Sequence, residues 1–186
     1  MAGRTIQADV MNPSEEVVSA ASSVLHEGGI VVYPSDTVYG LMAGSESKDA
    51  HSRIIHLKGY SEPRPFIHLV GSFEDAMERT TGKSNLQQWM EKYWPGPVTL
   101  LLPKGKEKIA IRIPADPLSR AVLSVSGLCL ISTSANLKGE DDPLSTNDIP
   151  ESILAGADLV IDGGTLTRRK PSMIIDISGP KPVRLR

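Results

Sequence analysis

Residues 13–34 constrain the fold most, because a helix pattern, a glycine stop and a buried strand pattern follow one another directly. Residues 13–16, Pro-Ser-Glu-Glu, carry the start signals of a helix, and apolar residues then recur at helical spacing. The glycine pair at 28–29 ends this pattern, and Ile-Val-Val-Tyr at 30–33 is typical of a buried strand. This order predicts an α/β protein.

The rest of the chain continues to mix the two patterns. Helices are predicted at residues 48–57, 73–77, 85–93 and 117–124, and strands at 65–70, 98–103, 109–114, 128–132, 158–162 and 173–177. Because some strands follow a helix and others follow a strand, we expect a mixed sheet covered by helices. A length of 186 residues suits a single domain, 1–186. The polar segment 137–147 is long enough to be a mobile lid.

Charge and composition exclude several classes of function. The net charge of -2 and the aromatic content of 4% argue against a protein that binds nucleic acid over its whole surface. Cys129 is the only cysteine, so no disulfide framework is available and a reducing compartment is indicated. The N-terminal segment lacks a signal-peptide pattern, and no apolar run approaches the roughly 20 residues that span a bilayer. We therefore expect a soluble, cytoplasmic protein without membrane contact.

Four polar segments adjoin predicted strands, at residues 34–41, 58–64, 112–114 and 132–136. Strand ends in an α/β sheet expose side chains to a common crevice, so these segments are candidates for one site. In the last segment, Ser-Thr-Ser-Ala-Asn, hydroxyl and amide groups could hold phosphate oxygens. Lys58 would add a point charge, and Arg64 or Arg112 a planar fork. The pattern alone predicts an anion-binding crevice.

Each feature also has an ordinary structural explanation. The Ser-Thr-Ser-Ala-Asn segment suits a helix cap or turn, Lys58 suits a solvated surface, and Arg112, between two isoleucines, suits the wet face of a strand. The chain has neither a Walker phosphate loop nor a Gly-x-Gly-x-x-Gly turn, so nucleotide binding would need another device. The four histidines show no metal-ligand spacing, so no metal site built from protein ligands is expected.

Together these segments resemble the YrdC-like family of threonylcarbamoyl-AMP synthases, from residue 28 to the end of the chain. Tyr-Pro-Ser-Asp-Thr-Val-Tyr-Gly-Leu at 33–41 is similar to the family's Pro-Thr-x-Thr-Val-Tyr-Gly-Leu segment. Tyr-Trp-Pro-Gly-Pro-Val-Thr at 93–99 is similar to its Trp-Pro-Gly-Pro-x-Thr segment, and 112–114 and 132–136 to later motifs. The resemblance implies the YrdC-like α/β fold, a twisted mixed sheet with flanking helices around a concave, positively lined cavity.

The resemblance implies a nucleotidyltransferase that combines L-threonine, bicarbonate and ATP, which carries Mg²⁺, into threonylcarbamoyl-AMP and pyrophosphate. Separate tRNA threonylcarbamoyl-transferase proteins would use the product to modify tRNA, and tRNA or double-stranded RNA is a further candidate partner. Thr37 and Arg112 would contact threonine, while Lys58, Ser134 and Asn136 would be the catalytic groups at the nucleotide phosphates. The supporting contacts to nucleotide or threonine would be Ser132, Ser172 and Arg184.

One position departs from the family pattern. The family has Lys-x-Arg where this chain has Lys58, Gly59 and Tyr60, so the planar cation is missing there. Arg64, in the same loop, is the candidate to supply it for nucleotide binding. Tyr60 favours a different function, that of a YrdC-like paralogue that binds nucleotide or double-stranded RNA without synthase activity. A carbamoyl-transferring domain like that of hydrogenase maturation proteins and an interaction module without chemistry are two more candidate functions.

Overall fold

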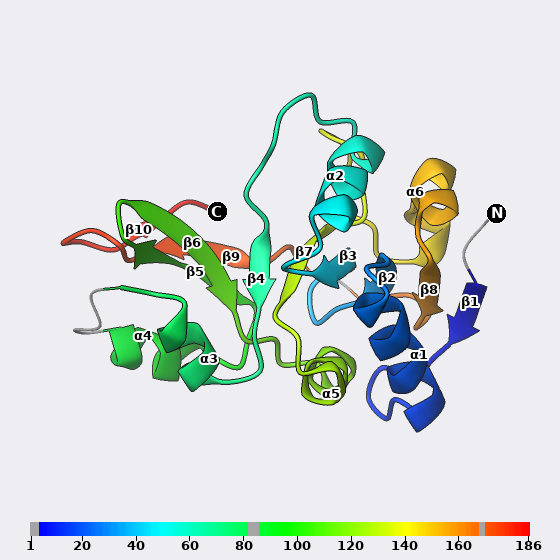
Figure 1. The fold of residues 1–186 in the computed structure, drawn as a ribbon, viewed down its shortest axis with the longest axis horizontal. Helices are drawn as coiled ribbons and strands as arrows, with labels where there is room; N and C mark the ends of the chain where they lie inside the picture. Colours follow the sequence, from blue (N-terminus) through cyan, green and yellow to red (C-terminus); the bar gives the residue numbers. More distant parts are fainter. Residues whose placement is uncertain (1–3, 82–85, 168–169) are drawn as a thin grey trace.

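The computed structural model describes residues 4–81, 86–167 and 170–186, and ten strands within them form one sheet (Figure 1). The strand order is β1-β8-β2-β3-β7-β4-β6-β5-β9-β10, and parallel and antiparallel pairs both occur. The strands are β1 (Arg4–Gln7), β2 (Val31–Pro34), β3 (Tyr39–Gly44), β4 (Ile67–Leu69), β5 (Val98–Lys104), β6 (Glu107–Arg112), β7 (Leu130–Ser134), β8 (Leu159–Asp162), β9 (Met173–Asp176) and β10 (Val183–Arg184). The helices are α1 (Glu15–His26), α2 (Lys48–Leu57), α3 (Phe73–Glu78), α4 (Leu86–Tyr93), α5 (Pro117–Ser126), the 3₁₀ turn η1 (Thr146–Asp148) and α6 (Glu151–Gly156). The expected mixed α/β sheet with flanking helices is confirmed.

Polar side chains fix the starts of four helices. Ser14, Ser47, Ser72 and Asp116 precede α1, α2, α3 and α5, and each accepts a hydrogen bond from a backbone N–H of the first helical turn. Gly127 ends α5 in the left-handed conformation, with φ of 64°. The predicted helices are found within a few residues of their expected ends, and residue 85 of the helix expected at 85–93 lies outside the described residues.

The helices divide between the two faces of the sheet. Successive strand residues point to opposite faces, so Val31 packs with α1 and α5 while Val32 packs with α2 and α6. Helices α3 and α4 pack on the other half of the sheet, against Ile111 and its neighbours on β5 and β9. Side chains that alternate with this cluster, among them Arg112 and Ile174, instead line a cavity.

The structure contains elements that the sequence patterns do not predict. Residues 39–44, expected in part as a polar segment, form β3, which is buried along its length and forms a hairpin with β2. β3 also pairs with β7, so it lies in the middle of the sheet. β1, α6 and β10 likewise occupy segments for which no element is predicted.

Segment 137–147 is hydrogen-bonded to the rest of the protein at several points, while its role as a mobile lid stays a prediction. Pro143 O accepts a hydrogen bond from Tyr39 N at 2.9 Å, and Leu144 O accepts one from Leu166 N at 2.7 Å. The longest exposed run in the segment is residues 138–141. Within this run, Lys138 N still donates to Lys58 O at 3.2 Å and Glu140 O accepts from Asn136 Nδ2 at 2.7 Å.

Candidate active site

A cavity of about 340 Å³ is lined by polar residues at the ends of several strands of the sheet. Gly40 is in register with Ser134 on β7 and with Tyr33 on β2, and Ser132 is in register with Ile67 on β4. Residues that pair in this way point to the same face, so the four strands present their side chains together. The polar lining residues are Tyr33, Ser35, Thr37, Tyr60, Arg64, Arg112, Ser132, Thr133, Ser134, Ser172 and Arg186.

Gly40 leaves room for a tyrosine to lie across the cavity wall. A Cβ atom at Gly40 would lie 2.9 Å from Tyr33 Cε1, which is closer than real Cβ contacts come, and 3.1 Å from Thr133 O, which is tighter than most of them. The Tyr33 hydroxyl lies 2.8 Å from Ser132 Oγ. Burial raises the pKa of Tyr33 to about 12, so the phenol is neutral at physiological pH. Tyr33 and Ser132 thus form an uncharged polar part of the wall.

Arg112 is 5% exposed and lies at the floor of the cavity, so it is not a solvated strand residue. Its guanidinium forms a buried ion pair with Asp36, and Nε donates to Gly96 O at 3.0 Å. A longer contact of 3.5 Å joins Nη1 to Thr37 Oγ1. Burial lowers the pKa of Arg112. These contacts with described residues use three of the five N–H groups of the guanidinium, so two are available to a ligand.

Thr37 lies in the turn between β2 and β3. Ser35 Oγ is 2.9 Å from Thr37 Oγ1, donates to Val38 O at 2.7 Å and accepts a bond from Thr37 N at 3.1 Å. The Thr37 side chain is buried, yet it lines the cavity. The turn therefore places Thr37 beside Arg112, while the contact of either residue with threonine stays a prediction.

Lys58 is 1% exposed and lies behind the cavity wall. Its Nζ donates to Ser134 O at 2.6 Å, Asn136 O at 2.7 Å and Asn136 Oδ1 at 3.0 Å. Burial lowers the pKa of Lys58 to about 8, and the charge of Asp142 opposes this shift. Lys58 is thus no solvated surface residue. Because an ammonium has three protons, a direct phosphate contact would require one of these bonds to open.

Asn136 is oriented by the same network. Ser134 Oγ donates to Asn136 Oδ1 at 2.7 Å, and Asn136 Nδ2 donates to Glu140 O at 2.7 Å. Asn136 is 9% exposed and is not among the cavity-lining residues, whereas Ser134 is. In this arrangement Lys58 and Asn136 hold the end of β7 in shape, and Ser134 faces the cavity.

Tyr60 and Arg64 both line the cavity, although their loop is largely exposed. Arg64 Cζ lies 4.9 Å from the centroid of the Tyr60 ring, and Lys58 Nζ lies 5.8 Å from it. Arg64 therefore reaches the cavity in contact with Tyr60, the residue that stands where the Lys-x-Arg pattern has its arginine.

Near the C-terminal end, the cavity is lined by Arg186 and not by the predicted site residue Arg184, whose role stays a prediction. Arg186 Nε donates to Ser172 O at 2.9 Å and Nη2 to Ser172 Oγ at 3.3 Å. Ser172 is buried, and its Oγ lies 3.1 Å from Thr99 Oγ1. Arg184 is exposed and its Nε donates to Arg186 O at 3.2 Å. The sequence alone does not indicate which of two arginines, two residues apart, lines the cavity.

The structure brings most of the predicted site residues to one cavity. Those that line it are Thr37, Arg64, Arg112, Ser132, Ser134 and Ser172. The lining residues that the sequence did not predict as site residues include Tyr33, Gly40, Phe66, Ile67, Ile174 and Arg186. The alternation of strand residues could have identified Tyr33, whereas Ile67 required knowledge of which strands pair.

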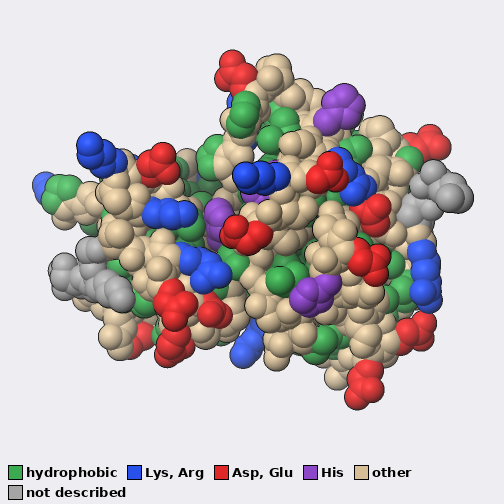
Figure 2. Space-filling model, in the orientation of Figure 1, with side chains coloured by type: hydrophobic (Ala, Val, Ile, Leu, Met, Phe, Trp, Pro, Cys, Tyr) green, Lys and Arg blue, Asp and Glu red, His purple; other side chains and the backbone are tan. Residues whose placement is uncertain are grey.

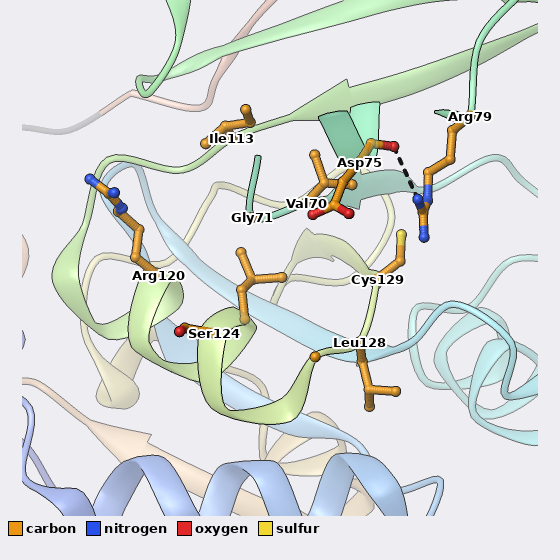
Figure 3. A pocket seen from close by; sticks show the side chains of 11 residues that line it. Val70, Gly71, Asp75, Arg79, Ile113, Arg120, Ser124, Leu128 and Cys129 are labelled. Carbon is orange, nitrogen blue, oxygen red and sulfur yellow. Dashed lines mark hydrogen bonds between the residues drawn. The ribbon is translucent and has the colours of Figure 1, made fainter. Parts of the chain in front are cut away.

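A larger cavity, about 460 Å³, contains none of the predicted site residues (Figure 3). Val70, Ile113 and Cys129 contribute to it, and Arg79 Nη1 donates to Asp75 O at 3.0 Å on its rim. We place the site in the smaller cavity, because that cavity has the buried cation and the converging hydroxyl groups.

Within the described residues, no group of three or more His, Cys, Asp or Glu side chains could hold a metal ion. Within the same part of the chain, no helix has the length and apolar character needed to cross a membrane. On the face shown in Figure 2, Lys and Arg side chains are interspersed with Asp and Glu, so that face carries no broad basic surface.

Comparison with known proteins decides the family. Residues 23–186 match the model of the Sua5/YciO/YrdC family, which is described as telomere recombination. The chain belongs to this family. A threonylcarbamoyl-AMP synthase of Nitrosococcus oceani is 32% identical over 170 residues, which make up 86% of this chain and 92% of that protein. The chain spans about half the length, 53% and 55%, of two other curated relatives of the same name.

Solved structures of family members have the same fold. P. abyssi Sua5 complexed with L-threonine matches with a TM-score of 0.89 at 28% identity, covering 98% of this chain and 56% of that one. E. coli YciO matches with a TM-score of 0.88 at 26% identity, covering 99% of this chain and 95% of that one. The expected YrdC-like fold is therefore confirmed.

Proposed function

We propose that this chain is an L-threonylcarbamoyladenylate synthase, which forms threonylcarbamoyl-AMP, pyrophosphate and water from L-threonine, bicarbonate and ATP. The observation that carries the proposal is that Thr37, Arg112 and the hydroxyl groups at the end of β7 surround one cavity. Relatives of this name in the same family support it. A cavity of about 340 Å³ is also within the range of small-molecule sites.

Threonine would occupy the floor of the cavity. A planar guanidinium binds a carboxylate through two parallel N–H bonds, and Arg112 has two N–H groups to offer. The Thr37 hydroxyl lies beside them. The L-threonine in the P. abyssi Sua5 complex supports an amino-acid site in this fold.

ATP would lie along the end of β7, where Ser132, Ser134 and Ser172 present hydroxyl groups. Mg²⁺ would enter with ATP and neutralise the charge of the leaving pyrophosphate. The chain's own contribution would be to align the carbamate oxygen with the α-phosphorus, since positioning and fixed donors supply most of the catalysis in such transfers. Lys58 and Asn136 would hold the end of β7 in its binding shape.

The product would pass to separate tRNA threonylcarbamoyl-transferase proteins, because threonylcarbamoyl-AMP is an activated intermediate and not an end product. We place the protein in the cytoplasm as a single domain, 1–186. The single thiol of Cys129, which is free, fits a reducing compartment.

Pyrophosphate release by the purified chain with ATP, Mg²⁺ and bicarbonate, with and without L-threonine, tests the proposal. We expect release that depends on both threonine and bicarbonate, and mass spectrometry should detect threonylcarbamoyl-AMP. Arg120→Gln, which changes an exposed arginine outside the proposed site, is the control. Release that ignores threonine would refute the synthase assignment.

The second candidate is a paralogue that binds nucleotide or double-stranded RNA without synthesis, and Tyr60 is the residue that favours it. This function predicts ATP binding without pyrophosphate release. If RNA is the ligand, a mobility shift should weaken steeply with rising salt.

A further inference from the structure

The cationic side chains around the cavity differ in how many hydrogen bonds and ion pairs they already form with other protein groups. Lys58 donates to three acceptors, Arg112 pairs with Asp36, and Arg186 donates twice to Ser172. Arg64 lines the same cavity, and among the described residues it has no hydrogen bond or ion pair. All five N–H groups of its guanidinium are therefore open to an anion, whereas Arg112 keeps two and already uses three within the protein.

Tyr60 gives this exposed arginine a defined position. The guanidinium carbon lies 4.9 Å from the ring centroid, within the range of a cation–π contact. The backbone of Tyr60 is fixed at the end of α2, because Tyr60 N donates to Ile55 O at 3.0 Å. Phe66 is buried at the other end of the loop. Contact with a ring face leaves the N–H edges of a guanidinium free for phosphate oxygens.

We propose that Arg64 contacts the nucleotide phosphates and that Tyr60 is a positioning residue whose ring holds Arg64 at the cavity. This inference rests on the proposed use of ATP, and it assigns the side chains that bind its phosphates. Tyr60 then does not remove phosphate binding from the site; it supports an arginine four positions further along the chain.

Calorimetric titration with MgATP and, separately, with inorganic tripolyphosphate tests the pair. Arg64→Gln should weaken both ligands about 10- to 100-fold, the usual loss for one or two charge-assisted hydrogen bonds. Tyr60→Leu should weaken both roughly 3- to 30-fold, and Tyr60→Phe, which keeps the ring face, should retain most of the affinity. In the Arg64→Gln background, Tyr60→Leu should cost nothing further, because the ring then has no guanidinium to hold. Arg120→Gln, in the larger cavity, is the matched control.

Two results would overturn the inference. One is unchanged binding of both ligands by Arg64→Gln; the other is a loss in Tyr60→Leu that affects MgATP but not tripolyphosphate, because the ring would then contact the base. The proposed function fails separately, through pyrophosphate release that ignores threonine. If the wild-type chain bound no ATP, the tripolyphosphate titrations would still test the Arg64 and Tyr60 pair.

Discussion

Lys58→Met should destabilise the protein, although it removes a buried charge that is costly to hold. A folded-state pKa of about 8 against the ordinary 10.5 means that the fold disfavours the charged form by about 3 kcal/mol. Against this, the substitution removes the Lys58 donor from Ser134 O, Asn136 O and Asn136 Oδ1, of which Asn136 Oδ1 keeps the bond from Ser134 Oγ. Hydrogen bonds to a charged group contribute about 1.5–3 kcal/mol each. The net loss should therefore be roughly 2–5 kcal/mol.

Urea denaturation of wild-type and Lys58→Met measures this loss as a lower midpoint with an unchanged slope. Lys138→Met, which changes an exposed lysine on the neighbouring loop, is the control and should stay within about 0.5 kcal/mol of wild type. Weaker MgATP binding should accompany the lower stability, because the end of β7 loses its support. A Lys58→Met protein as stable as wild type would refute the view that Lys58 holds residues 134–136 in place.

Three further predictions concern pH, the floor of the cavity and its wall. The folded pKa of Lys58, about 8, lies below its unfolded value of 10.5, so the unfolded chain binds more protons between these values. The unfolding free energy of wild type relative to Lys58→Met should therefore rise with pH through this window, and a flat difference in denaturation midpoints would contradict the shift. Arg112→Lys keeps the charge but loses the planar fork, so the KM for threonine should rise at least about tenfold. Gly40→Ala places a methyl group 2.9 Å from Tyr33 Cε1 and should cost about 1–3 kcal/mol in denaturation experiments; a neutral effect would show that the ring can move aside.

Sequence reasoning predicted helices α1 to α5, but not α6, because the signals of those five are local. The cap residue before α1, α2, α3 or α5 and the glycine after α5 each lie within a few residues of the pattern they delimit. β3 escaped prediction for a physical reason. It is buried on both faces in the centre of the sheet, so it shows no alternation of polar and apolar residues, and its two glycines resemble a turn.

The site was predicted in its residue types more reliably than in its contacts. Thr37, Arg112 and Ser134 do meet around a cavity, but they meet because β7 pairs with both β3 and β4, and this pairing joins strands distant in sequence. Lys58 lies behind the wall because its acceptors come from residues 134–136, at least 76 positions further along the chain. Spacing along the chain cannot encode such a contact.

The way in which Arg112 and Arg64 are held at the cavity bears on whether Tyr60 favours the synthase or the paralogue. Arg112 is fixed by Asp36 and Gly96 before any ligand arrives, so it can bind a carboxylate with little further loss of side-chain freedom. Arg64 is fixed only by an aromatic ring, a contact worth about 0.5–1 kcal/mol at an exposed site, so it can adjust to phosphates that change shape during the transfer. A guanidinium held against that ring at the cavity suits a phosphate-bearing ligand, which both the synthase and a nucleotide-binding paralogue would have. The contact of Tyr60 with Arg64 therefore shows that Tyr60 is compatible with ATP binding, and threonine-dependent pyrophosphate release is the measurement that separates the two functions.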